Sequence, residues 1–396
     1  MDGASVGAQH AVPLLVFLLC LSSLRCCETK LDTLQAEAIL RNACTYLWNK
    51  QSADGGWHSE THGILRGGQA WTPFVLSALL EVPDDVYTKP ELKIERALDF
   101  IRTSVNAEGV LGVSDPDVLE YPNYTTAYAL RVLVKHGAAR DKLLIEKMKK
   151  YLASQQFVEQ RGFRPDDLVY GSWGFGETNL PPHTPGFVDI SHARRILEAL
   201  REAKHGDQRT FDNAQDFLRL LQKHPTESRT QPGVDGTGKP RYDGGFYFSP
   251  VVLARNKGGR ETDSTGGESA YRSYATATCD GVLALLAAGL PRDDNRIQAA
   301  LQWLHEYPAL DRPQGIPGDA AEQWHKVMFY YHLLVRSEMY AAFGIQGEWR
   351  SEMVDLLESR QREDGSFSNP YGELNKEDDP LLATAMVVGT MVNVLR

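Results

Sequence analysis

The sequence predicts an all-α fold, an α/α toroid in which six helical hairpins form an inner and an outer ring of helices. Apolar residues recur at helical spacing in paired segments that fill the chain from residue 31 to residue 396. The second segment of each pair is apolar nearly all round, whereas the first is amphipathic. A glycine-containing turn with an aromatic residue recurs between them, which is typical of a repeat. Amphipathic helices outside apolar ones predict a closed barrel with a concavity at the ends of its inner helices.

Glycine and proline mark the ends of the first three pairs. Pro83 ends the second helical pattern, and Gly137 is a natural C-cap for the fourth. The long loop 157–185 separates the two helices of the third pair. The predicted helices are 31–50 with 69–81, 91–103 with 124–136, and 141–156 with 189–203.

The last three helix pairs follow the same pattern of helix, loop and helix. The loop 225–267 is the longest irregular stretch, and long loops in compact domains are usually functional or mobile. Within it, residues 245–250 allow at most one short strand. The predicted helices are 211–223 with 268–288, 295–306 with 320–343, and 348–360 with 381–395.

Composition places the chain among globular proteins. Its 396 residues are 42% hydrophobic and 24% charged, with a net charge of −10. Because phosphate binding needs a basic face, a nucleic-acid partner is not expected. The length alone would allow two or three domains, but a repeat makes residues 31–396 a single domain. No protein partner is predicted.

The N-terminus predicts export. Residues 11–24 are apolar and have the length of a signal-peptide core, so residues 1–27 are interpreted as a signal peptide. No Lys or Arg precedes them, and the alternative is a mis-assigned start followed by an apolar leader. Lipid modification of Cys26 or Cys27 would tether the protein to a membrane, although Leu24 and Arg25 suit that signal poorly. We expect a periplasmic or extracellular protein that can associate with a membrane.

The recurring turn identifies a resemblance. Gln51–Trp57 and Gln361–Phe367 read Gln, a short gap, Asp-Gly-Gly/Ser and then an aromatic residue. Tyr242–Phe246 matches without the Gln. Gly171–Gly174, together with Gln155 or Gln156, matches with an insertion between the two parts. With this pattern the chain resembles the prenyltransferase and squalene/oxidosqualene cyclase repeat proteins, which fold as α/α toroids. The turns are expected to join outer to inner helices and to brace neighbouring hairpins.

The resemblance implies an enzyme acting on an isoprenoid, but the cyclase acid motif is degenerate. Its Asp-x-Asp-Asp-Thr-Ala pattern falls on 277–282, where Cys279 takes the place of the proton-donating Asp and Asp280 alone survives. A cyclase that protonates an alkene needs a strongly acidic carboxylic acid aimed into an apolar cavity. The alternatives are a paired carboxylate for Asp280, with Arg272 for example, and a small core residue for Cys279.

No metal or other cofactor is expected. The zinc site of protein prenyltransferases needs an Asp and a Cys two residues apart and a His on the last inner helix. Neither is present, because Cys279 and Asp280 are adjacent and residues 379–384 contain no His. His325 and His332 are seven residues apart on one face, but hydrogen-bonded or solvated histidines explain them better than a metal.

Further candidates lie near the starts of the inner helices. Asp189 and His192 share a face, and either line the cavity as an acid–base pair or are a helix cap and a rim histidine. Aromatic side chains there suit carbocation binding, sugar stacking or plain packing of the turns. The predicted ligand-binding residues are Trp71, Tyr124, Tyr128, Tyr271, Tyr274 and His325.

Three functions remain open. The first is a terpene cyclase or prenyltransferase-like enzyme with an apolar ligand in the central cavity. The second is a non-catalytic binding or scaffold toroid, which side chains plugging the barrel would favour. The third is a carbohydrate-active α/α barrel, which needs two carboxylates facing one cleft; the candidates are Asp189, Glu268 and Asp280.

Overall fold

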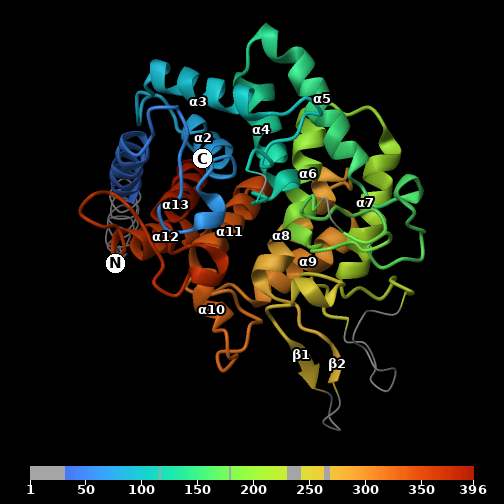
Figure 1. The fold of residues 1–396 in the computed structure, drawn as a ribbon. Helices are drawn as coiled ribbons and strands as arrows, with labels where there is room; N and C mark the ends of the chain where they lie inside the picture. The colour runs from blue at the N-terminus through green and yellow to red at the C-terminus, as the bar shows by residue number, and fades with distance from the viewer. Residues whose placement is uncertain (1–31, 116, 178–179, 230–241, 263–267) are drawn as a thin grey trace, which may run out of the picture.

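Two concentric rings of helices make up the part of the chain that the structure describes (Figure 1). The computed structural model describes residues 32–115, 117–177, 180–229, 242–262 and 268–396. Each inner helix packs against the next, and the last packs against the first, so the ring closes. The inner helices within these residues are α2 (Trp71–Leu80), α4 (Pro122–His136), α6 (Ile190–Glu202), α8 (Ala275–Ala287), α11 (Phe329–Phe343) and α13 (Pro380–Leu395). The predicted α/α toroid is confirmed.

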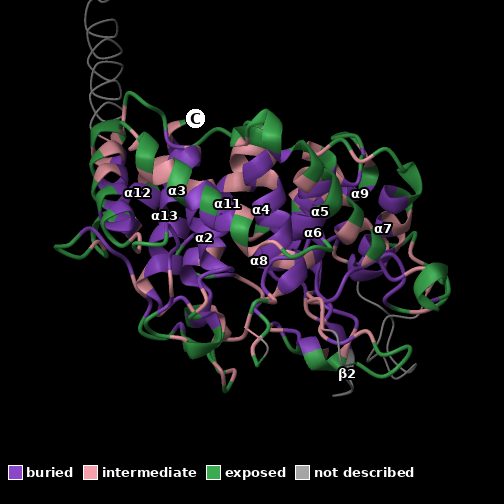
Figure 2. Cartoon of the chain, turned by 45° about the horizontal axis from the view of Figure 1, so that its top comes forward, coloured by how far each residue is buried: buried purple, intermediate pink, exposed green. Residues whose placement is uncertain are grey.

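The outer ring contributes one helix before each inner helix. Burial follows the sequence pattern, because α13 is buried along most of its length whereas α5 buries only Met148 and Leu152. Figure 2 shows the same contrast between inner and outer helices. The outer helices are residues 32–49, α3 (Glu91–Ser104), α5 (Lys142–Ser154), α7 (Gln208–Leu221), α9 (Asn295–Glu306) and α12 (Trp349–Glu358).

The recurring turn braces neighbouring hairpins through its glutamine. Gln51 Nε2 donates to the Gly55 carbonyl within the turn, at 2.9 Å, and to the Lys93 carbonyl of the next outer helix, at 2.8 Å. Gln156 and Gln222 repeat this pair of bonds toward α7 and α9. Gln361 bonds back to Ile39 at 3.0 Å and so links the last hairpin to the first. The bracing role that the sequence predicts is confirmed.

The same turn is fixed to the inner helix by its aromatic residue. The Trp57 amide donates to Thr72 Oγ1 at 3.0 Å, and its indole Nε1 donates to the Leu47 carbonyl at 2.7 Å. Gly55 has φ +95°, and a Cβ there would lie 2.3 Å from the Arg96 carbonyl oxygen, so only glycine fits between turn and helix. Equivalent amide-to-threonine bonds join Leu111 to Thr126, Phe246 to Thr278 and Phe367 to Thr384.

Two predicted helices differ from the structure. Residues 268–271 are not helical, because β2 (Glu268–Tyr271) pairs antiparallel with β1 (Arg260–Thr262) and α8 begins only at Ala275. The segment 320–343 divides at Met328 into α10 (Trp324–Val327) and α11, since Met328 has φ −104° and ψ 41°. Residues 245–250 form no named strand, although Phe246 makes an isolated bridge with Gln222. Short 3₁₀ turns lie at Gly63–Leu65, Ala139–Asp141, Glu159–Arg161, Val252–Ala254 and Glu373–Asn375.

The predicted signal peptide, residues 1–27, lies outside the described residues, as do Cys26 and Cys27. None of the helices in the described ranges is long and apolar enough to cross a membrane. Cys44 and Cys279, both described, are buried free thiols.

Candidate ligand-binding cavity

A cavity of about 400 Å³ opens at the end of the barrel where the inner helices begin. Five inner helices, α2, α4, α6, α11 and α13, contribute side chains from their first two turns or from just before them, and the long loops contribute the rest. Most of the described lining side chains are aromatic or apolar, among them Trp71, Tyr121, Tyr124, Phe175, Phe187, Phe248, Trp324, Met328, Tyr331, Leu382 and Met386. This composition suits an apolar ligand.

Asp189 and His192 come together at this cavity through the cap of α6. The Asp189 carboxylate accepts hydrogen bonds from the His192 amide at 2.9 Å and from Ser191 Oγ at 2.7 Å. His192 Nδ1 lies 2.8 Å from Asp189 Oδ2. Although burial opposes it, the charge of His192 lowers the pKa of Asp189 to about 2. Asp189 is therefore the cap of α6, and both Asp189 and His192 line the cavity.

The imidazole of His192 is held between aromatic rings. Its centroid lies 4.2 Å from that of Phe175 in a stacked arrangement and 4.8 Å from that of Tyr124. Asp189 at Nδ1 orients the imidazole, and this ring, which can hold a proton, lines the apolar cavity.

Asp280 lies below the cavity and does not line it. Its Oδ1 accepts from Arg194 Nη1 at 2.9 Å, and its Oδ2 accepts from the Tyr331 hydroxyl at 2.9 Å. The residue is 1% exposed. Burial raises the pKa of Asp280, and the charges of Arg194 and Arg195 offset part of that rise. The structure therefore favours the paired carboxylate, with Arg194 rather than Arg272 as the partner.

A network of charged side chains that includes Asp280 joins the inner helices α6, α8 and α11. Arg194 bonds Glu198 at 2.7 Å and Glu338 at 2.6 Å, and Arg195 bonds the same two carboxylates. Both arginines are 2% exposed. A second cavity, of about 520 Å³ and lined by these groups, opens at the opposite end of the barrel. The network separates an apolar end from a charged end.

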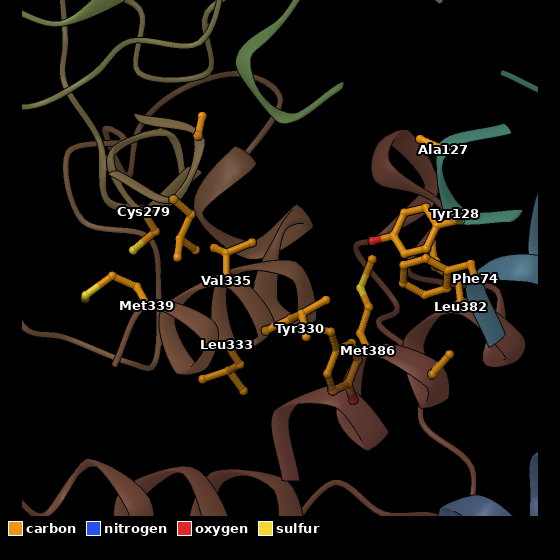
Figure 3. Close-up of a cluster of buried hydrophobic side chains, with 14 of the residues drawn as sticks. Phe74, Ala127, Tyr128, Cys279, Tyr330, Leu333, Val335, Met339, Leu382 and Met386 are labelled. Carbon is orange, nitrogen blue, oxygen red and sulfur yellow. The ribbon is translucent and has the colours of Figure 1, made fainter. Parts of the chain in front are cut away.

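Cys279 is a core residue. It is fully buried, and burial raises the pKa of its thiol to about 11, so the thiolate is disfavoured. Figure 3 draws it among apolar side chains that include Val335 and Met339 of α11. The apolar alternative for this residue is therefore the one that the structure supports.

The predicted ligand-binding residues divide between three places. Trp71 and Tyr124 line the aromatic cavity, and Trp71 Nε1 donates to Asp379 at 3.0 Å. Tyr128 lines the charged cavity instead, with the Arg195 guanidinium 5.7 Å from its ring centroid. Tyr271, Tyr274 and His325 line neither cavity. The helix predicted over 268–288 begins only at Ala275, so Tyr271 lies in β2 and Tyr274 is the N-cap of α8.

No three described His, Cys, Asp or Glu residues are grouped so that they could hold a metal ion. His325 and His332 lie on separate helices, α10 and α11. Burial and the charge of Arg336 lower the pKa of His332 to about 3, and its Nε2 lies 3.1 Å from the Ala309 carbonyl. His332 is thus a neutral, hydrogen-bonded core histidine.

Sequence reasoning missed several residues of the cavity. Phe175, Phe187, Phe248 and Lys257 lie in the long loops, where no periodicity assigns a side chain to a face. The Arg194-Arg195 pair had a visible signal, because two arginines in the middle of an inner helix need buried partners.

The fold and the cavity define an α/α toroid with an aromatic cavity at one end. The type II terpene cyclase MstE from Scytonema shares this fold: a variant in complex with geranylgeranyl dihydroxybenzoate matches with TM-score 0.56 and 14% identity, over 92% of this chain and 98% of that one. The apo form of MstE matches with TM-score 0.53 and 16% identity, over the same shares.

A carbohydrate enzyme has the fold as well. An inactive variant of the α-1,6-mannanase from Salegentibacter, in complex with α-1,6-mannotriose, matches with TM-score 0.52 and 11% identity, over 91% of this chain and 99% of that one. No protein-family model and no curated protein matches the sequence. At these identities the likeness establishes the fold and leaves the activity open.

Proposed function

We propose that the chain binds an apolar small molecule of isoprenoid type in the aromatic cavity. The lining carries this proposal, since it is largely aromatic and apolar, and about 400 Å³ lies in the range of roughly 300–1,000 Å³ common for small-molecule sites. Aromatic rings and methionines fit an unsaturated hydrocarbon chain closely. The complex of MstE with geranylgeranyl dihydroxybenzoate supports an isoprenoid for this fold.

Binding is favoured over cyclisation by the state of Asp280. An alkene-protonating acid must direct a proton into the cavity. Both oxygens of Asp280 accept hydrogen bonds, from Arg194 and Tyr331, and the residue does not line the cavity. Asp280 therefore holds the inner helices together through its buried hydrogen bonds and does not contact the ligand.

The contact between His192 and Asp189 favours a second candidate, an enzyme that moves a proton on the bound ligand. His192 lines the cavity and its Nδ1 faces Asp189 at 2.8 Å. This candidate is tested by turnover of prenyl and triterpene substrates, with retention expected in Asp280→Asn and loss in His192→Gln. Absence of turnover in all three proteins contradicts it.

The carbohydrate alternative is the least supported. Among the described lining residues, Asp189 is the single carboxylate of the aromatic cavity. Glu198 and Glu338 do share the charged cavity, but although burial opposes it, Arg194 and Arg195 lower the pKa of both. A glycosidase needs one carboxylic acid that remains protonated, and neither glutamate is suited to that role.

The binding proposal is tested by blocking one cavity at a time. Leu382→Trp fills the aromatic cavity, and Val392→Trp, on the same helix, fills the charged one. Equilibrium dialysis with radiolabelled geranylgeraniol is expected to show binding to the wild type and to Val392→Trp, and loss in Leu382→Trp. Circular dichroism checks that both variants fold. Equal binding by the two variants, or no binding by the wild type, contradicts the proposal.

We also propose export of the chain, because residues 11–24 have the composition of a signal-peptide core. N-terminal sequencing of the secreted protein tests this. A mature chain that begins near residue 28 supports it, and a retained Met1 opposes it.

A further inference from the structure

Lys257 is a half-buried cation of the aromatic cavity that is attracted by the charge of Asp189 but makes no hydrogen bond or ion pair with it among the described residues. Its ammonium Nζ lies 3.0 Å from the ring centroid of Phe248 and 5.4 Å from that of Trp324. No described residue forms a hydrogen bond or an ion pair with it. Aromatic faces attract the charge, but they supply no hydrogen-bond acceptor in place of the lost water. Burial lowers the pKa of Lys257 to about 7, although the charge of Asp189 acts in the opposite direction.

Hydrogen bonds within its loop fix the position of Lys257. The neighbouring Asn256, which is 7% exposed, accepts from the Phe248 amide at 2.6 Å and from the Ser249 amide at 3.1 Å. It also donates to the Ser249 carbonyl at 2.8 Å. These bonds close the loop onto itself and hold Lys257 against Phe248, the ring it covers. A solvated surface lysine has no such support.

The charges around the cavity are positive although the whole chain is acidic. Lys257, Arg255 and Lys376 are among the described lining residues, against the single carboxylate of Asp189, whereas the whole chain has a net charge of −10. Asp189 is 0% exposed and committed to the cap of α6. Arg255 pairs with Glu322, which leaves the two lysines to face a ligand. A cleft lined by one sign of charge concentrates ligands of the other sign.

We propose that the apolar ligand of this cavity carries an acidic head group, an oxyanion of the carboxylate or phosphate class, that is held by Lys257. This inference rests on the proposed function, because it names the ligand class of the same site. The apolar chain lies among the aromatic and methionine side chains, and the head group supplies the acceptor that Lys257 lacks. A hydrogen-bonded ion pair in such a site is stronger than one in water.

The test compares ligands that share one chain and differ in the head group. Geranylgeranoic acid, geranylgeranyl phosphate and geranylgeraniol are measured by equilibrium dialysis at about pH 6.5, where the carboxylic acid is ionised. In the wild type at least one acid is expected to bind about tenfold more tightly than the alcohol. In Lys257→Met this preference is expected to disappear, because the acids lose the cation that holds them. The matched control is Lys326→Met, whose ammonium covers Tyr371 outside the cavity and whose loss leaves the preference intact.

The outcomes separate the two proposals. If none of the three ligands binds, the proposed function fails. If the alcohol binds as tightly as both acids, or if Lys257→Met keeps the preference, the acidic head group is refuted while the apolar site stands. Preference for only one acid identifies the head group as carboxylate or phosphate. Lys257→Gln repeats the measurement if Lys257→Met does not fold.

Discussion

Replacing Asp280 by Asn separates a structural acid from a catalytic one. In the structure this carboxylate is 1% exposed and pairs with Arg194, which is 2% exposed. Removing one partner of a buried ion pair costs about 3–5 kcal/mol, because the other charge remains in the interior. Asn keeps the acceptor for Tyr331, and Arg194 retains Glu198 and Glu338. We therefore expect a loss near the lower limit, about 3 kcal/mol.

Thermal unfolding measures this loss together with its coupling to Arg194. With an unfolding entropy of about 2 cal/mol/K per residue, about 3 kcal/mol corresponds to a fall in Tm of about 4 °C. The loss of unfolding free energy in the double variant Asp280→Asn/Arg194→Met is expected to be smaller than the sum of the losses in the two single variants. Arg194→Met alone leaves the charge of Asp280 unpaired, and Asp280→Asn removes that charge. Circular dichroism at several heating rates checks that the unfolding is reversible.

The opposite result would place Asp280 in a different role. If Asp280→Asn costs less than about 0.5 kcal/mol of stability and its effect adds to that of Arg194→Met, Asp280 and Arg194 do not form a stabilising buried ion pair. A variant with unchanged stability and abolished turnover of a cyclase substrate would identify Asp280 as the acid of a cyclase.

Three further predictions follow from single contacts. Gln361→Ala removes the bond to the Ile39 carbonyl that closes the ring and is expected to cost about 1–3 kcal/mol in urea unfolding, against little change in the exposed control Gln302→Ala. Asp189→Ala removes the cap of α6 and should cost about 1–2 kcal/mol by the same measurement; no loss would refute the capping role. Lys257→Met should raise the Tm of the ligand-free protein more at pH 6 than at pH 9. Since burial lowers the pKa of Lys257 from 10.5 to about 7, the unfolded chain holds an extra proton between these values, and wild-type stability rises with pH there. An equal shift at both pH values contradicts the burial of this charge.

The ring could be predicted from the sequence because its signals are local and repeated. The apolar inner helices, the amphipathic outer helices and the Gln51–Trp57 turn each follow from the order of residues within one hairpin. The brace made by Gln222 could not be predicted in this way. Gln222 makes the same brace as Gln51, but an insertion separates it from the Gly244 turn, so no spacing pattern reveals it.

The cavity could be predicted only in part. His192, Asp189, Tyr124 and Trp71 are at or near the starts of inner helices, and the helical pattern assigned them to one end of the barrel. Lys257 and its neighbours come from loops, and their position depends on contacts such as those of Asn256 that span no regular element. The partner of Asp280 also required the fold, because Arg194 lies on a different helix.

The binding site itself is tested most directly by a crystal structure of the protein soaked with geranylgeranoic acid. We predict density for the hydrocarbon chain between Phe175 and Met386, with the carboxylate within hydrogen-bond distance of Lys257 Nζ. Density confined to the charged cavity beside Arg195 and Glu338, or an empty aromatic cavity at saturating ligand, would contradict the assignment.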